Sequence, residues 1–217
     1  MSLWFDFQTN DQRVTHKWTH YFQAYENHFS RFRGQSATVL EIGCGAGGSL
    51  QMWKRYFGPH AQIVGIDITQ GCKGFEEDQV AVRIGSQADT GFLDALLEEF
   101  GAFDIVLDDG SHRMDDIRTS FTHLYPTQPA NGVYMVEDLH TAYRPAYGGG
   151  LGVAGSFIEI SKGLIDELNA DWTGGALPAT GFTRATTSIH FYDSLVAFER
   201  GRHRVGVSQA TGGRSAG

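Results

Sequence analysis

Two acidic segments stand where a strand is expected to end. Residues 107–112 read LDDGSH after the apolar start FDIV, and residues 136–140 read VEDLH at the end of the run GVYMVEDL. Carboxylates are poor strand formers and are costly to bury without a partner. Both segments are therefore either turns in which acids cap helices, or a place where negative charge binds something positive.

These two segments meet if their strands are neighbours in a parallel sheet, because the carboxyl ends of parallel strands line the ligand crevice. The side chains expected to share this gap are Asp108, Asp109, His112, Glu137 and Asp138. Carboxylates so close repel one another, and a hard cation such as Mg²⁺ relieves that repulsion. Successive strand residues point to opposite faces, so Glu137 and Asp138 can share a metal only if the backbone turns there.

His112 follows Asp109 by one short turn and could take a proton from a substrate hydroxyl. The chain holds 9 histidines, so a surface histidine near a helix start is the competing interpretation. For His123 and His140 we favour that ordinary interpretation.

A glycine-rich loop, EIGCGAGGS at 41–49, lies between the first expected strand and the first expected helix. Gly43 permits the tight turn, and Gly45 lets a ligand approach the backbone. Glu41 suits a positively charged amino group and repels a pyrophosphate. Asp67 ends the next strand, where a carboxylate meets ribose hydroxyls in nucleotide-binding folds. A plain strand-to-helix turn, with Asp67 as a cap or turn residue, is the alternative.

The elements that must position these residues alternate along the chain. Apolar runs predict strands at 37–43, 61–69, 79–86, 103–109 and 132–139, and two more joined at Ser194 within 183–201. Helical spacing of apolar residues predicts an aromatic helix at 15–33 and helices at 48–57, 92–100, 115–125 and 156–169. We therefore predict an α/β, Rossmann-like three-layer sandwich, with helices on both faces of a mostly parallel sheet.

The composition suits one soluble domain over residues 1–205, with a tail at 206–217 that we expect to be disordered. The net charge is −8 and no stretch concentrates Lys and Arg, which argues against a nucleic-acid partner. No apolar run is long enough to span a bilayer, and the N-terminus lacks a signal-peptide pattern. With Cys44 and Cys72 as the two cysteines, we expect a cytoplasmic protein.

The segments VLEIGCGAGGS and IVGIDI resemble motif I and the following acidic strand of class I methyltransferases, which use S-adenosylmethionine. The resemblance implies a seven-stranded sheet with one antiparallel strand near the C-terminus. It also implies that Glu41 and Gly43–Gly45 hold the methionine part of the cofactor, and Asp67 the ribose. Gln87 and Asp89 are then expected near the adenine, although Asp89 is equally well placed to cap the following helix.

A narrower resemblance covers most of residues 15–200. The segments KWTHYFQAYENHF, GSLQMWKRYFG, DIVLDDGSH and VYMVEDLHTAY are similar to metal-dependent sugar O-methyltransferases of antibiotic biosynthesis, the macrolide-sugar and rhamnosyl group. This resemblance implies Asp109, Glu137 and Asp138 as Mg²⁺ ligands, His112 as the base, and Asp108 lying toward the cofactor. It implies a glycoside or sugar acceptor and a homo-oligomer. Some macrolide-sugar members carry an additional N-terminal domain, for which this chain has no room.

We therefore expect a Mg²⁺-dependent O-methyltransferase that moves a methyl group from S-adenosylmethionine to a hydroxyl, on a sugar diol of a natural product or glycan. The first alternative is an NAD-dependent oxidoreductase, because GCGAGG also satisfies the pattern G-x-G-x-x-G. Glu41 and the paired acids argue against it. A non-haem iron enzyme needs two histidines and a carboxylate, and His112 alone is well placed. A non-catalytic binding protein that keeps the fold is the last alternative.

Overall fold

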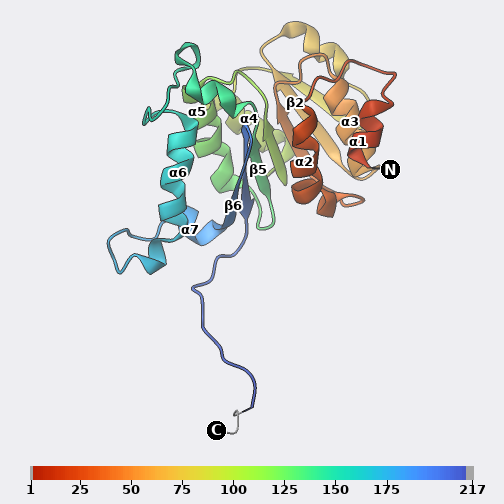
Figure 1. The fold of residues 1–217 in the computed structure, drawn as a ribbon. Coiled ribbons are helices and arrows are strands. Elements are labelled where there is room, and N and C mark those ends of the chain that lie inside the picture. Colours follow the sequence, from red (N-terminus) through yellow and green to blue (C-terminus); the bar gives the residue numbers. More distant parts are fainter. Residues whose placement is uncertain (1, 214–217) are drawn as a thin grey trace.

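A seven-stranded sheet forms the centre of the computed structural model, which describes residues 2–213 (Figure 1). The strands are β1 (Thr38–Ile42), β2 (Gln62–Asp67), β3 (Val80–Ile84), β4 (Ile105–Asp108), β5 (Val133–Val136), β6 (Thr186–Tyr192) and β7 (Leu195–Arg200). Their order is β3-β2-β1-β4-β5-β7-β6. The first five strands pair in parallel, and β7 runs antiparallel to both β5 and β6. The predicted sheet and its one antiparallel strand are confirmed.

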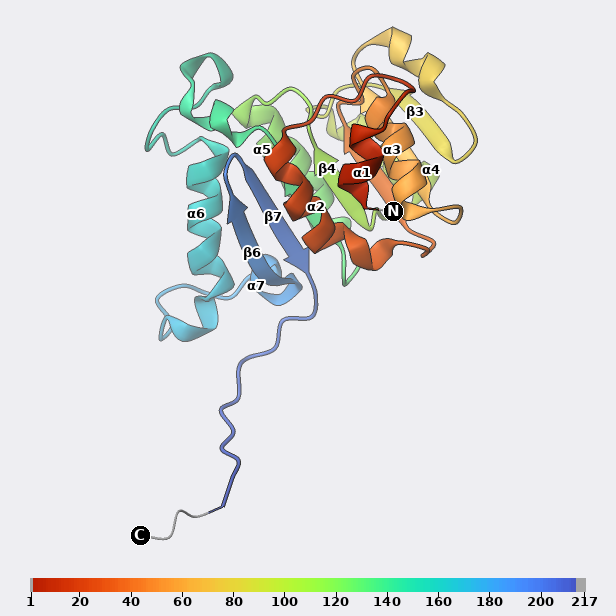
Figure 2. The same ribbon diagram turned by 45° about the vertical axis from the view of Figure 1, so that its right-hand side comes forward.

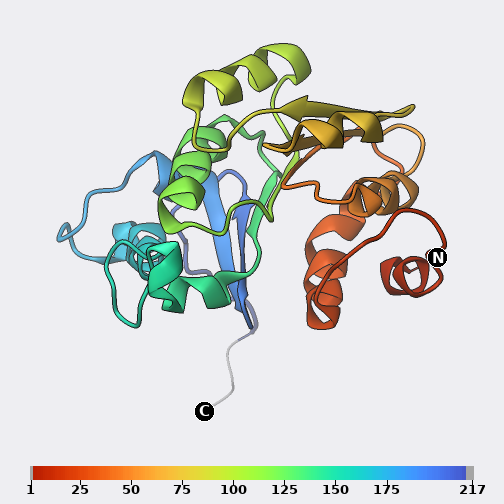
Figure 3. The same ribbon diagram turned by 90° about the horizontal axis from the view of Figure 1, so that it is seen from above.

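Helices cover both faces of this sheet, as the apolar strands require. They are α1 (Leu3–Gln8), α2 (Phe22–Phe29), α3 (Gly48–Phe57), α4 (Thr90–Phe100), α5 (Met114–Leu124), α6 (Phe157–Leu168) and α7 (Gly181–Ala185). Helices α1, α2 and α3 lie together on one face, and α4, α5 and α6 cover the other (Figures 2 and 3). The predicted three-layer sandwich is therefore confirmed.

Strand alternation decides which face each site residue meets. In β1, Val39 packs in the layer of α2 and α3, whereas Leu40 and Ile42 pack in the layer of α4 and α5. Glu41 therefore points toward α3. By the same alternation Asp108, two residues after Val106, points toward α5. Strand alternation alone therefore places Glu41 in the layer of α3 and Asp108 in the layer of α5.

The N-terminal region differs from its prediction. A helix was expected over 15–33, but α2 begins at Phe22 after one turn of 3-10 helix at Thr19–Tyr21. Residues 14–18 are neither helix nor strand. They line the cleft at the strand ends, together with the glycine loop. The aromatic spacing reflects the burial of Tyr21, Phe22 and Tyr25, but it begins several residues before the first residue of the helix.

The C-terminal region also differs in detail. The expected strand at 183 starts instead at Thr186, because Thr180 caps the short helix α7 with a capping box. Residues 206–213 contain no helix or strand, and residues 214–217 of the predicted tail lie outside the described residues. Within residues 2–213, no helix is long and apolar enough to cross a membrane.

Candidate active site

The carboxyl ends of β1, β4 and β5 open into a cleft of about 320 Å³. Residues 14–18 form one wall and the loop after β1 forms another. Seven of the predicted site residues line this cleft: Gly43, Gly45, Asp67, Asp109, His112, Glu137 and Asp138. The structure therefore brings the glycine loop and both acidic segments together at one edge of the sheet.

A second cavity of about 440 Å³ adjoins this cleft, because Gly43, Asp67 and Gly110 line both. Its other walls include the apolar side chains of Ile42, Ile66 and Ile68 and the polar side chain of Gln87. The two cavities form one groove with Asp67 in the middle. One end of the groove is acidic and the other is largely apolar, which suits a ligand with a charged end, a polar middle and a flat ring.

The loop after β1 keeps its shape through three glycines with positive φ, of which Gly47 (φ 76°) directly precedes α3. Gly43 has φ 87° and Gly45 has φ 47°. The amide of Gly45 donates a hydrogen bond of 3.1 Å to Oδ2 of Asp67. The loop then enters α3 at Gly47, which makes no side-chain cap hydrogen bond.

Glu41 lies fully buried under the floor of the cleft. Ser49 donates a hydrogen bond of 2.6 Å to its Oε2. Among the described residues, its Oε1 has no hydrogen-bond partner and lies 3.2 Å from Nζ of Lys17. Burial raises the pKa of Glu41, although Lys17 and Ser49 oppose that shift. The ammonium group of Lys17 therefore already pairs with the carboxylate that the sequence assigned to the amino group of a methionine moiety.

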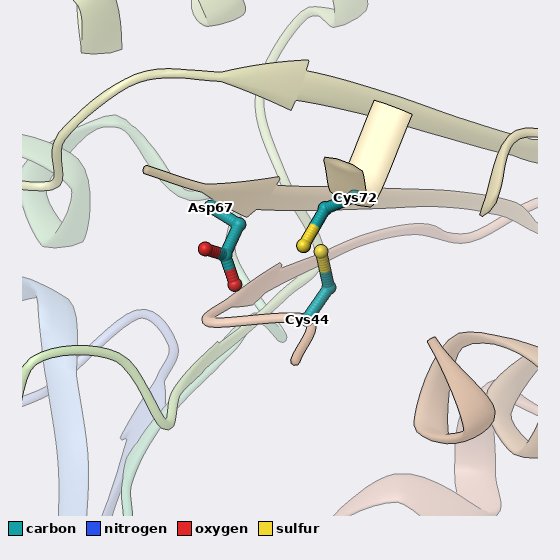
Figure 4. A group of neighbouring side chains, drawn as sticks. All are labelled: Cys44, Asp67 and Cys72. Carbon is teal, nitrogen blue, oxygen red and sulfur yellow. The ribbon is translucent and has the colours of Figure 1, made fainter. Parts of the chain in front are cut away.

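Asp67 is braced by the backbone and lies beside two cysteines. Its Oδ1 accepts a hydrogen bond of 2.8 Å from the amide of Thr69. The sulfurs of Cys44 and Cys72 face each other next to this carboxylate (Figure 4). Burial raises the pKa of both thiols, and the Cys72 thiol donates to the carbonyl of Gly45 at 3.4 Å. The two thiols therefore remain protonated at neutral pH and support the loop.

The acidic end of the groove gathers Asp109, His112 and Asp138, whose ligand atoms lie within 4.8 Å of one another. Nε2 of His112 lies 4.0 Å from Oδ1 of Asp109 and 3.6 Å from Oδ2 of Asp138. Both His112 (φ 56°) and Asp138 (φ 55°) adopt left-handed backbone. From the sequence, Glu137 and Asp138 could face one site only if the backbone turned between them. The left-handed turn at Asp138 provides this, because it directs into the cleft a side chain that strand alternation would point to the opposite face. Tyr21 donates a hydrogen bond of 2.9 Å to Asp138.

Glu137 keeps the direction that the strand gives it, toward α2, and is buried. It accepts a short hydrogen bond from the hydroxyl of Tyr25, and its Oε2 lies 3.1 Å from Nζ of Lys17. Burial raises the pKa of Glu137 to about 8, against the opposing effect of Lys17. The carboxylate oxygens of Asp109 and Asp138 suit a hard divalent cation such as Mg²⁺. Glu137, the third ligand predicted from the sequence, lies outside that group of ligand atoms, because Tyr25 and Lys17 engage its two oxygens.

Three predicted cofactor residues line neither cavity: Glu41, Asp89 and Asp108. Asp108 is buried on the α5 side, where it accepts hydrogen bonds from Gln87, Ser120 and Tyr134. Strand alternation turns it away from the acidic cleft, and it holds Gln87, which lines the second cavity, so its position toward the cofactor stays a prediction. Asp89 caps α4 by accepting from the amides at 91 and 92, which is the alternative weighed from sequence. Gln87 does line the second cavity, where its Oε1 accepts from the amide of Ser111.

Sequence reasoning missed three side chains of the site: Lys17, Tyr21 and Tyr25. Nζ of Lys17 lies 2.7 Å from Oδ2 of Asp109, and its side chain is 2% exposed. Burial lowers the pKa of Lys17, but the surrounding carboxylates outweigh that effect and raise it well above the usual value. One signal existed in the sequence. Lys17 has no acidic residue within one helical turn, unlike many surface lysines on helices.

Comparison with known proteins places this geometry among methyltransferases. No family model matches the chain. It is 40% identical over 202 residues to 8-demethyl-8-(2-methoxy-alpha-L-rhamnosyl)-tetracenomycin-C 3'-O-methyltransferase of Streptomyces olivaceus, covering 88% of this chain and 51% of that protein. It is 37% identical to Mycinamicin VI 2''-O-methyltransferase of Micromonospora griseorubida, covering 84% of this chain and 48% of that protein.

A solved structure agrees with these relatives. MycE methyltransferase from the mycinamycin biosynthetic pathway, in complex with Mg, SAH and mycinamycin VI, matches with a TM-score of 0.79 at 35% identity. The match covers 92% of this chain and 53% of that one, so the chain spans about half the length of the relatives it matches.

The fold and the groove define a domain of the class I methyltransferase type. More narrowly, the chain is a relative of the sugar O-methyltransferases of macrolide and tetracenomycin pathways. The alternative of an NAD-dependent oxidoreductase is not supported, because these relatives are named as methyltransferases.

Proposed function

We propose that this chain supplies the cofactor and metal sites of a Mg²⁺-dependent O-methyltransferase that acts on a sugar hydroxyl. The observation that carries the proposal is the single cleft shared by the glycine loop and the acidic residues Asp109, Glu137 and Asp138. The relatives named above support the reaction class.

The cofactor end of the groove has a partner for each part of S-adenosylmethionine, which when bound supplies a methyl group activated by its sulfonium. Glu41 would attract the ammonium group by its negative charge from beneath the cleft, where Lys17 and Ser49 hold its two oxygens. Asp67 stands at the middle of the groove, at the strand end where ribose hydroxyls bind in such folds. The cavity near Ile66 and Gln87 offers an apolar wall and a polar amide to the adenine.

The acceptor end has a place for a metal and a base. Mg²⁺, which Asp109, Glu137 and Asp138 would hold, supplies Lewis-acid polarisation of an acceptor hydroxyl when bound. His112 lies in the same cleft and would remove the hydroxyl proton, a contribution of about 10²–10⁴-fold for a general base. Trp18 lines the cleft with half of its surface exposed, so it offers a flat apolar face to an acceptor.

The substrate class remains part of the proposal. We propose a deoxysugar or rhamnose-like unit on a natural product or glycan, which the names of the relatives support. Assembly into a homo-oligomer and a cytoplasmic location stay predictions.

Calorimetric titration of S-adenosylhomocysteine, with Mg²⁺ and then with EDTA, tests the cofactor assignment. We expect micromolar binding of S-adenosylhomocysteine and no binding of NAD. Methyl transfer to a panel of glycosides then tests the reaction, and EDTA should abolish it. Binding of NAD in place of S-adenosylhomocysteine would overturn the proposal.

A further inference from the structure

One buried lysine links the cofactor end of the cleft to the metal end. Nζ of Lys17 lies 3.2 Å from Oε1 of Glu41, 2.7 Å from Oδ2 of Asp109 and 3.1 Å from Oε2 of Glu137. These acids come from the ends of three strands, β1, β4 and β5. An ammonium group with three donors therefore meets three carboxylates, one from each strand.

The charge balance of the cleft depends on this one side chain. Among the described residues that line the cleft, Lys17 is the only lysine or arginine. The lining acids are Asp67, Asp109, Glu137 and Asp138, and Glu41 lies just beneath them. Buried carboxylates without a counter-ion are costly, so removal of the cation beside them destabilises the folded chain strongly.

The segment that carries Lys17 is held firmly in place. A Cβ atom on Gly48, the first residue of α3, would lie 2.3 Å from the carbonyl oxygen of Val14 and 2.4 Å from that of Arg13. The side chain of Arg13 also donates to the carbonyl of Phe75 at 3.0 Å. Lys17 therefore projects from a packed segment, and its position among the acids is fixed by the fold.

We propose that Lys17 is a built-in cation that competes with the divalent cation for Asp109 and Glu137, and holds the acidic cluster together when no metal is bound. This inference rests on the proposed function, which places Mg²⁺ at these acids. Lys17 occupies Oδ2 of Asp109 and Oε2 of Glu137, so a metal must displace those ion pairs or use the oxygens that remain.

The two possible roles of Lys17, competition with the metal and support of the acids, predict opposite changes in Mg²⁺ affinity when Lys17 is removed. If Lys17 competes, its removal frees two oxygens and adds one net negative charge, so a divalent cation binds more tightly. If Lys17 only positions the acids, its removal lets them move apart and the cation binds more weakly. The affinity for Mg²⁺ therefore separates the two roles without any measurement of methyl transfer.

Titration of Mg²⁺ by calorimetry provides the test, on wild type, K17M, K17R and the control K162M. Lys162 is an exposed lysine of α6 that pairs with Glu159, away from the cleft. We expect K17M to bind Mg²⁺ ~10-fold or more tightly than wild type, because a neighbouring cation is lost. K17R keeps the charge and should not gain affinity, and K162M should match wild type. An unchanged or weaker affinity in folded K17M overturns the proposal.

Thermal unfolding gives a second readout. Mg²⁺ should raise the melting temperature of K17M more than that of wild type, because K17M is expected to bind the ion more tightly and lacks its own cation in EDTA. If K17M does not fold in EDTA, the variant K17M/E137Q removes one charge of each sign from the cluster. Recovery of a folded protein supports the charge role, and failure of the double variant to fold shows that Lys17 acts through packing and overturns the proposal.

Failure of the proposed function gives a different pattern. Wild type would then bind neither S-adenosylhomocysteine nor Mg²⁺, and K17M would bind neither as well. Wild type that binds S-adenosylhomocysteine, with Mg²⁺ affinity equal in wild type and K17M, overturns the role of Lys17 alone.

Discussion

A Cβ atom on Gly43 would lie 2.2 Å from the backbone carbonyl oxygen of Asp109, so the glycine loop and the acidic segment touch directly. The contact follows from the sheet, in which the last residue of β1, Ile42, pairs with Asp108 of β4. The proposed cofactor loop and the proposed metal segment are therefore packed as one unit. A side chain at position 43 must displace Asp109 or distort the loop.

Substitution of Gly43 tests this coupling. Gly43→Ala should weaken both S-adenosylhomocysteine and Mg²⁺ binding, because the methyl group meets backbone that cannot move aside. Gly45→Ala is the matched control, since Gly45 also has left-handed backbone but nothing lies within 4 Å of its added Cβ. The control should cost only about 1–2 kcal/mol of backbone strain and leave Mg²⁺ binding intact. Equal Mg²⁺ affinities in the two variants, measured by calorimetry, would contradict the coupling.

His112 is expected to act in turnover and not in cofactor binding. His112→Ala should lower kcat by about 10²–10⁴-fold and leave the affinity for S-adenosylhomocysteine unchanged. His123→Ala is the control, because His123 lies on α5 and pairs with Asp94 outside the cleft. Steady-state kinetics with calorimetry separate the two effects. Full activity in His112→Ala would show that another group takes the proton.

Removal of one carboxylate oxygen tests the metal site. Asp109→Asn should weaken Mg²⁺ binding ~10-fold or more, because a neutral amide is a poorer ligand for a hard cation. Asp89→Asn is the matched control, since Asn caps a helix about as well as Asp and Asp89 lies outside both cavities. Calorimetry with Mg²⁺ should leave the control unchanged. A loss of S-adenosylhomocysteine affinity in Asp89→Asn would instead restore the sequence prediction that Asp89 lies near the adenine.

Much of this arrangement could be predicted because it follows from periodicity and topology. Apolar runs fix the strands, and parallel strands bring their carboxyl ends to one edge. This logic brings Asp67 and Asp109 into one cleft, and Glu41 to the same Lys17 that pairs with Asp109. The same alternation places Asp108 outside the acidic cleft, since it points to the opposite face from Glu41 and Glu137.

The rest depends on contacts and turns that no local pattern encodes. The left-handed backbone of His112 and Asp138 occurs at residues other than glycine, so nothing in the sequence marks it. Lys17 meets acids that are distant in sequence, and its segment looked like the start of a helix because aromatic residues follow at helical spacing. Burial of a lysine among carboxylates can be seen only once the strands are assembled.

One carboxylate outside the cleft is expected to affect the stability of the fold. Glu199 of β7 accepts hydrogen bonds from His28 and Arg31, including one of 3.1 Å from Arg31. Burial raises the pKa of Glu199, but the bonds from His28 and Arg31 outweigh it and leave the pKa below its usual value of 4.5. A carboxyl whose pKa is lowered by folding stabilises the protein above its unfolded pKa. That contribution is lost as the pH falls through the lowered value.

Glu199→Gln should therefore reduce the free energy of unfolding by about 1.5–3 kcal/mol at pH 7, the range for hydrogen bonds to a charged group. The deficit should shrink as the pH falls below 4.5, because Glu199 of the unfolded chain then binds a proton first, and it should vanish once the pH falls through the lowered pKa of folded Glu199. Urea unfolding at pH 7 and at pH 4 measures both values, with Glu98→Gln on the exposed surface of α4 as control. A deficit that is equal at the two pH values would mean that Glu199 contributes by packing and not by charge.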